Sequence, residues 1–328
     1  MGTETSKLYD VTDTQTTERN EEMALLPKYQ TKLAELMEQK NLFAIKEMRN
    51  ELGPERMQKL VGSPYKDMTF VHLAVKSGSA NILAYLVNEC KADVCRKGTV
   101  DVALDRGGVV KVADATPLWI ACQMGNVNLV KAIVWLGGDK SINERTAIGS
   151  TALQVACYSG HCTIVKFLIE NTAGVEVNYN CLLAALSTKD RIHFEVAKYL
   201  LKEAHYNKVN EQDPDGMTLL AWCARGGNVN GLRLLIRYGA ECIPDKKGVT
   251  PIMVAAAHGH VTAVKFLLEY GDNVNSKDHE GHDAVYWASR NGHTEIAKIL
   301  LDNRFRKHYG HTKIRPASIF ESDFDDDE

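Results

Sequence analysis

Three histidines stand directly after the hairpin glycine of a repeat and are the first candidates for chemistry in this sequence: His161, His260 and His293. An imidazole can transfer protons near neutral pH or bind a transition metal. It can also bond to the backbone of an adjacent turn, and a position that recurs in this way is typical of a structural role. The sequence contains no phosphate-binding glycine-rich loop, His-Glu-x-x-His motif or nucleophile elbow. We therefore favour the structural role and predict no enzyme, no bound metal and no cofactor.

The eight cysteines could form disulfides or bind zinc. Cys122, Cys157 and Cys223 fall at equivalent positions of three helical segments, where a small buried residue is required. Cys90 and Cys95 are close in sequence, but no second Cys or His pair follows at the spacing of a zinc ribbon. We therefore expect reduced packing residues rather than a zinc site.

Several side chains of the types that are enriched in the cores of protein interfaces lie near the ends of short helical segments. Trp119 with Met124, Tyr158, and Trp222 with Arg225 are the clearest cases. The alternative role of Trp119 and Trp222 is packing between neighbouring helices, and for either residue alone the sequence does not separate the two roles. The helices that carry these residues must therefore be located.

Residues 250–271 show how those helices are built. Thr250 is suited to cap a helix that begins at Pro251, because proline lacks the N–H group that would go unbonded there. Small alanines follow, and Gly259 can adopt the left-handed conformation that ends the helix. Apolar residues then recur at helical spacing until Gly271. The segment predicts two short antiparallel helices.

This pattern recurs about every 33 residues with a T-P-L-H-x-A signature, which is typical of ankyrin repeats. Signatures begin at Thr69, Thr116, Thr151, Thr218, Thr250 and Asp283. The interval between Thr151 and Thr218 is twice the period, so it must contain a degenerate repeat, which we place near residue 180. We predict an all-α ankyrin-repeat solenoid over 28–303, with about eight helix-turn-helix units and a cap at 28–62 that covers the core.

One interval breaks the period. Between Thr69 and Thr116 lie about 14 extra residues, which we place within 93–114. The segment alternates weakly and contains Gly107 and Gly108, so we predict a β-hairpin-like finger rather than a helix. Insertions in repeat proteins often emerge on the binding face. The alternative is a tolerated surface insertion without a function.

The two ends of the chain differ from the repeats in composition. Residues 1–22 are polar, a composition that does not repay the entropy of ordering, and we expect a disordered tail. After Asn303 a basic stretch leads to the acidic segment 321–328, so we predict a second tail over 304–328. The net charge of −3 includes six acidic residues of that segment, so the repeats themselves are close to neutral.

Charge and hydropathy limit the classes of partner. The repeats carry no stripe of clustered Lys and Arg, which argues against nucleic acid. The sequence contains neither an apolar run of about 18 residues nor a secretory signal, which argues against a membrane span and against secretion. We expect a soluble protein of the cytoplasm, or of the cytoplasm and nucleus, whose partner is a protein or peptide.

The chain resembles the amino-terminal ankyrin array of the Fem family in four stretches: PERMQKLVG, the insertion ADVCRKGTVDVALDRGG before ATPLW, STALQVACYSGHCTIVKFLIE and MTLLAWCARGG. The resemblance implies a substrate receptor of a cullin-RING ubiquitin ligase that binds the carboxy-terminal residues of its targets, known as C-degrons. The family continues into further helical repeats and a box that binds the elongin-cullin machinery, whereas this sequence ends at Glu328. The alternative is a freestanding ankyrin scaffold or regulator with no link to ubiquitination.

We predict a peptide-binding groove on the concave face beside the insertion. Its residues are Asp101, Asp105, Trp119, Gln123, Met124, Tyr158, Ser159, Trp222 and Arg225. A rigid row of helices would supply preformed walls, so that little entropy is lost on the receptor side. The resemblance implies an acidic residue where this chain has Ser159 in family members that prefer a terminal arginine. A small or polar terminal residue is therefore expected, unless Asp101 and Asp105 supply the negative charge.

Overall fold

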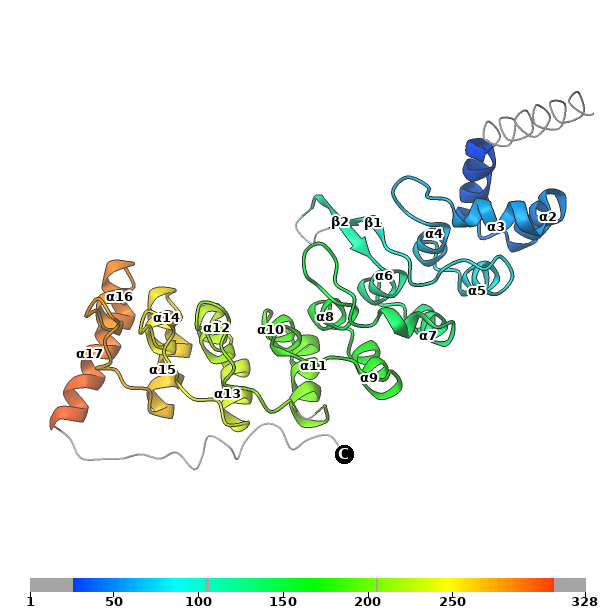
Figure 1. Ribbon diagram of the computed structural model, residues 1–328. Helices are drawn as coiled ribbons and strands as arrows, with labels where there is room; N and C mark the ends of the chain where they lie inside the picture. Colours follow the sequence, from blue (N-terminus) through cyan, green and yellow to red (C-terminus); the bar gives the residue numbers. More distant parts are fainter. Residues whose placement is uncertain (1–25, 104–106, 205, 310–328) are drawn as a thin grey trace, which may run out of the picture. The chain divides into compact units, whose positions relative to one another are not determined.

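The computed structural model describes residues 26–103, 107–204 and 206–309, and this part of the chain is mostly helical (Figure 1). It divides into two units, each described by itself below. Unit 1 runs to Val155 and includes 170–175, and unit 2 contains 156–169 and the residues from Glu176 onward. The predicted tail at 1–22 lies outside the described residues.

Unit 1 begins with helical residues 26–38 and continues through α2 (Leu42–Leu52), α3 (Pro54–Gly62), α4 (Phe70–Lys76), α5 (Ala80–Asn88), β1 (Gly98–Ala103), β2 (Val109–Ala115), α6 (Pro117–Gln123), α7 (Val127–Trp135) and the 3-10 helix η1 (Gly138–Ser141). Two helices, α8 (Ala152–Tyr158) and α9 (Cys162–Asn171), each contain residues of both units. Unit 2 continues with α10 (Tyr179–Leu186), α11 (Arg191–Lys202), α12 (Leu219–Gly226), α13 (Val229–Arg237), α14 (Pro251–Ala257), α15 (Val261–Tyr270), α16 (Ala284–Arg290) and α17 (Thr294–Tyr309).

The helix that follows each signature is called here the first helix of its repeat, and the next is called the second helix. Thr69, Thr116 and Thr218 each cap a first helix, because the hydroxyl oxygen accepts a hydrogen bond from the backbone N–H three residues later. Asn178 and Asp283 do the same for α10 and α16. A short side-chain acceptor thus marks the start of these five helices. Thr250 was predicted to do the same for α14, but its hydroxyl oxygen accepts no such bond, although α14 begins at Pro251 as predicted.

Neighbouring repeats of unit 2 pack in two layers (Figure 1). The first helices α10, α12, α14 and α16 contact one another in order, and the second helices α11, α13, α15 and α17 form the other layer. The degenerate repeat predicted near residue 180 is the pair α10 and α11. Residues 180–202 therefore follow the same architecture without the threonine signature.

The insertion in unit 1 is the predicted β-hairpin. Strands β1 and β2 pair antiparallel, with Val100 opposite Val112 and Asp101 opposite Lys111. The hairpin is fastened at its base by a hydrogen bond from Thr99 N to Asp67 O of 2.8 Å. Further fastening comes from the segment that precedes α8, where an ion pair of 2.7 Å joins Lys97 to Glu144 and Ala147 N donates to Ala113 O at 3.0 Å. These bonds hold the base of the finger against unit 1.

The last helix extends beyond the predicted end of the repeats at Asn303, because α17 continues to Tyr309. Arg304 Nη2 donates to Asp283 Oδ2 at 2.7 Å, and Asp283 also caps α16. This charge-assisted bond fastens the extra turn to the last repeat. Within residues 26–309, apart from the gaps given above, no helix is long and apolar enough to cross a membrane.

Candidate binding surface

His260 and His293, which follow hairpin glycines, bond to the backbone of the neighbouring repeat, as predicted. His260 Nε2 lies 2.8 Å from Arg225 O, and His293 Nε2 lies 3.2 Å from Ala257 O. In the degenerate repeat His193 does the same, with Nε2 at 2.7 Å from Tyr158 O. His193 was not predicted from the sequence, because it does not follow a glycine. These imidazoles connect successive repeats of unit 2 and are occupied by that structural role.

The histidine of the first signature joins the hairpin to α4. His72 is fully buried, with Nε2 at 2.9 Å from Ala115 O and Nδ1 at 2.6 Å from Thr69 Oγ1. A carbonyl oxygen can only accept, so Nε2 carries the proton and Nδ1 accepts from Thr69. Burial lowers the pKa of His72 below its ordinary value of 6.5, and the nearby charges of Arg96 and Lys76 lower it further.

We expect His72→Gln to flatten the dependence of stability on pH. Because the folded-state pKa of His72 is lowered, the unfolded chain binds a proton that the folded chain rejects as pH falls below about 6.5, and stability is lost there. Glutamine suits the site, since Gln154 occupies the equivalent position of α8 and accepts from Thr151 N at 3.0 Å. Urea midpoints at about pH 7.5 and about pH 5.5 should differ less in the variant than in the wild type. An unchanged difference would show that His72 does not contribute.

The three cysteines of the first helices are buried, as predicted, but their predicted equivalence is wrong. Cys122 and Cys157 are the sixth residue after the capping threonine, whereas Cys223 is the fifth. Cys122, Cys157 and Cys223 are at most 2% exposed, and none forms a disulfide. Burial raises the pKa of the Cys223 thiol to about 12 and raises that of Cys122 further. Such thiols are poor nucleophiles at neutral pH. Among the described residues there is no group of three or more His, Cys, Asp or Glu side chains that could hold a metal ion.

The predicted groove residues of unit 1 differ in exposure. Asp101 is exposed and lies directly opposite Lys111 in the hairpin, so its negative charge faces a positive one. Trp119 is only 3% exposed, and its Nε1 donates to Ser150 Oγ at 3.1 Å. Gln123 is half-buried, whereas Met124 at the end of α6 is 42% exposed. Of these residues, Met124 presents the largest apolar surface, and Trp119 belongs to the packed interior. Asp105 lies outside the described residues.

In unit 2 the structure brings two of the predicted residues into direct contact. The guanidinium of Arg225 lies over the ring of Trp222 at 5.1 Å from its centroid, and Trp222 Nε1 donates to Asp213 Oδ2 at 2.9 Å. Tyr158 is 60% exposed at the end of α8, and Ser159 beside it is half-buried. The single groove predicted from all nine residues stays a prediction.

A second tryptophan-arginine pair, which was not predicted from the sequence, lies on α16. Arg290 lies over the ring of Trp287 at 5.5 Å, and Trp287 Nε1 donates to Asp278 Oδ2 at 3.0 Å. Trp-x-x-Arg occurs at the same place in α12 and α16, with an aspartate nine residues before each tryptophan. This repeated spacing was visible in the sequence and could have revealed the pair.

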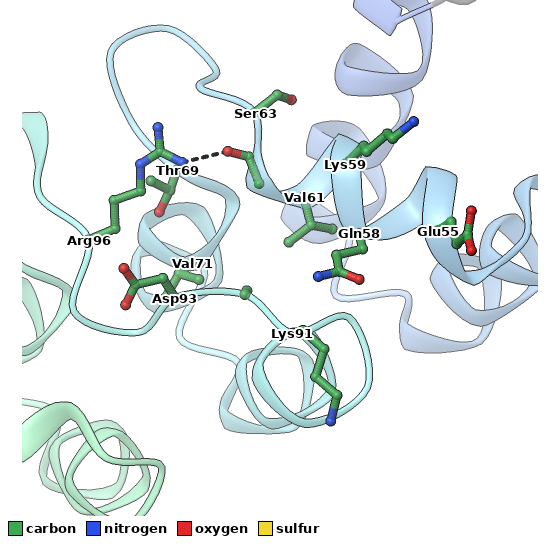
Figure 2. Close-up of a pocket in the computed structure, with 12 residues that line it drawn as sticks. Glu55, Gln58, Lys59, Val61, Ser63, Thr69, Val71, Lys91, Asp93 and Arg96 are labelled. Carbon is green, nitrogen blue, oxygen red and sulfur yellow. Dashed lines mark hydrogen bonds between the residues drawn. The ribbon is translucent and has the colours of Figure 1, made fainter.

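A cavity of about 730 Å³ in unit 1 lies beside α3 and residues 91–96 (Figure 2). Lys59, Lys91 and Arg96 line it, which invites comparison with an anion site. Figure 2 shows the two lysine side chains pointing away from each other, and Arg96 Nη1 is bonded to Gly62 O at 2.5 Å. The three cations therefore do not converge on one ligand.

Comparison with known proteins agrees with the repeat pattern. The family model for ankyrin repeats (3 copies) matches residues 94–181 and 241–313. The chain is 31% identical to mouse protein fem-1 homolog A-like over 66% of its own length and 32% of that protein. It is 31% identical to an IkB-like protein of African swine fever virus over 39% of its length and 57% of that protein, and 32% identical to mouse inversin over 56% and 18%. The chain thus spans less than two thirds of each of these relatives.

Proposed function

We propose that this chain, a mostly helical ankyrin-repeat protein and hence a protein-interaction module, binds an extended protein segment across the carboxyl ends of the first helices of unit 2. The observation that carries the proposal is a row of exposed side chains at those ends in unit 2: Tyr158, Arg225, His258 and Arg290. Each of these helices has a buried small residue one or two positions earlier, so the row stands on a rigid support: Cys157, Ala224, Ala256 and Ala288. Little ordering entropy is then lost when a ligand binds.

The composition of this row suits a peptide. An exposed tyrosine supplies a large contact area at low entropic cost, and the arginines can bond to carboxylate or carbonyl oxygens. In unit 1, Met124 occupies the corresponding place at the end of α6 and adds an adaptable apolar side chain. We include the exposed Met124 and Asp101 in the proposed binding face of unit 1, and assign Trp119 to its support.

We further propose that the bound segment is a protein carboxy terminus and that the protein is a substrate receptor of a cullin-RING ubiquitin ligase. The resemblance to the Fem family and the similarity to the mouse fem-1 homolog support this role. Affinity capture of the tagged chain, followed by probing for elongin and cullin, tests it. Retained peptide binding with neither protein captured would favour the freestanding scaffold instead.

Tyr158→Ala should weaken the binding of a selected peptide by about tenfold, as expected for loss of an exposed aromatic anchor. The peptide would be chosen by display of carboxy-terminal peptides against the wild-type chain, and its affinity measured by calorimetry. The matched control is Trp135→Ala, because Trp135 is 77% exposed but lies on the second helix α7.

The two variants separate the faces of the repeat. Both remove an exposed aromatic ring, so both should leave the folded state intact. If Trp135→Ala weakened peptide binding and Tyr158→Ala did not, the peptide would bind to the second helices. The binding face proposed here would then be wrong.

A further inference from the structure

Two tryptophan-arginine pairs place a positive charge at the same position of two repeats of unit 2. Trp222 with Arg225 and Trp287 with Arg290 stand on α12 and α16, at the same position of their repeats. Each indole N–H is bonded to an aspartate, which fixes the ring on which the guanidinium lies. Both arginine side chains are therefore presented to solvent on a rigid aromatic base.

The helix between α12 and α16 carries smaller side chains at the corresponding positions. Helix α14 packs against both α12 and α16, and at the position of the two tryptophans it carries Val254. At the position of the two arginines it carries Ala257. Two cations thus flank small apolar side chains, and His258 is exposed beside them. We call this surface, from Trp222 to Arg290, the arginine face.

The arginine face lacks bound acidic partners within the part of the chain that the structure describes. Among the described residues, the guanidiniums of Arg225 and Arg290 contact the tryptophan rings beneath them and have no hydrogen-bond or ion-pair partner. The nearby carboxylates of Asp213 and Asp278 already accept from tryptophan N–H and from backbone N–H groups. The N–H edges of both guanidiniums thus remain able to bond to carboxylates of a ligand.

The sequence itself contains a segment of complementary chemistry. Residues 318–328, SIFESDFDDDE, carry six acidic side chains and two phenylalanines and no basic residue. Carboxylates match the two guanidiniums, and a phenylalanine ring can lie against the half-buried Ala257 between them. We propose that the acidic segment 318–328 binds the arginine face of its own chain. The arginine face shares Arg225, His258 and Arg290 with the row proposed to bind a peptide, but the inference goes beyond that function, since it concerns the chain alone.

The connecting chain is long enough. Helix α17 has 16 residues and is about 24 Å long, so Tyr309 lies about that far from the turn beside Arg290. Residues 310–320 can span up to about 36 Å when extended, which covers this return. The axes of α16 and α12 are about 20 Å apart, because α14 lies between them and neighbouring helix axes are about 10 Å apart. The eight residues 321–328 can span about 27 Å. The segment can therefore reach both arginines at once.

Arginine modification in the full chain tests the proposal. Phenylglyoxal reacts with accessible guanidiniums, and peptide mass spectrometry gives the rate at each arginine. In a variant with Asp323, Asp325, Asp326 and Asp327 changed to Asn, we expect Arg225 and Arg290 to react about threefold faster or more than in the wild type. Arg237 is the internal reference, because it is exposed on the second helix α13 and its rate should stay unchanged. The wild type at about 1 M salt should behave like the variant.

A second variant controls for net charge. It carries four neutralising changes in the amino-terminal segment: Asp10→Asn, Asp13→Asn, Glu18→Gln and Glu21→Gln. Rates at Arg225 and Arg290 should match the wild type in this control. Equal rates in the wild type and the 323–327 variant would overturn the proposal, as would an equal acceleration in both variants. A dependence of the protection on protein concentration would also overturn it, because the occupant would then be a second copy.

Discussion

Trp119→Ala should lower the free energy of unfolding by about 3–5 kcal/mol, the cost of removing a buried tryptophan ring. Trp119 is 3% exposed in the interior of unit 1, and its Nε1 donates to Ser150 in the turn before α8. The substitution would leave a cavity beside α6 and remove the hydrogen bond that Ser150 Oγ accepts. Urea unfolding followed by circular dichroism measures the change.

Two further variants separate the causes. Trp119→Phe keeps most of the apolar volume and removes the N–H group, so it should cost about 1 kcal/mol plus a small packing term. Trp135→Ala removes an exposed ring and should change stability by less than about 0.5 kcal/mol. If Trp119→Ala were as mild as Trp135→Ala but impaired peptide binding, Trp119 would be an anchor of the ligand rather than part of its support.

Gly227→Ala should destabilise unit 2 by about 3 kcal/mol, with contributions from backbone strain and overpacking. Gly227 has φ of +62°, and a Cβ there would lie 2.6 Å from the ring of His260. The ring cannot move aside without weakening its bond to Arg225 O, which is 2.8 Å long. Thermal and urea unfolding of the variant would measure the loss.

The matched control is Gly239→Ala in the following loop. Gly239 has φ of +87°, but no heavy atom lies within 4 Å of a Cβ placed there. It should therefore cost only the backbone strain, about 1 kcal/mol. Equal losses at Gly227 and Gly239 would mean that His260 does not confine the turn.

Most of the fold could be predicted because its signals are local. A threonine or aspartate followed by a short apolar helix and a glycine defines each first helix within about ten residues. The hairpin was predictable for the same reason, since glycines and weak alternation mark it directly. Helix α17 extended past the predicted boundary at 303, because its continuation depends on the bond from Arg304 to Asp283, 21 residues earlier in the chain.

The candidate site was harder to predict because tryptophan serves both interiors and interfaces. In the sequence Trp119 and Trp222 differ by only one position, because they are the third and the fourth residue after their capping threonines; Trp119 is buried, whereas Trp222 is half-buried beneath an arginine. The difference lies in the partner of each indole N–H, a serine of the next repeat or an aspartate of the same one. The pairing of Asp101 with Lys111 could not be predicted from the sequence either, because it depends on an irregularity in strand register between Gly98 and Val100.

The bonds from His193, His260 and His293 to the preceding turn also bear on how fast the chain folds. Each bond joins residues that are about one repeat apart in sequence. The contacts between helices of adjacent repeats likewise join residues about one repeat apart. The average sequence separation of contacts therefore does not grow as repeats are added, and folding rates fall with that separation. A chain with one more repeat should collapse and order about as quickly as this one, since each new repeat meets a neighbour that is already in place.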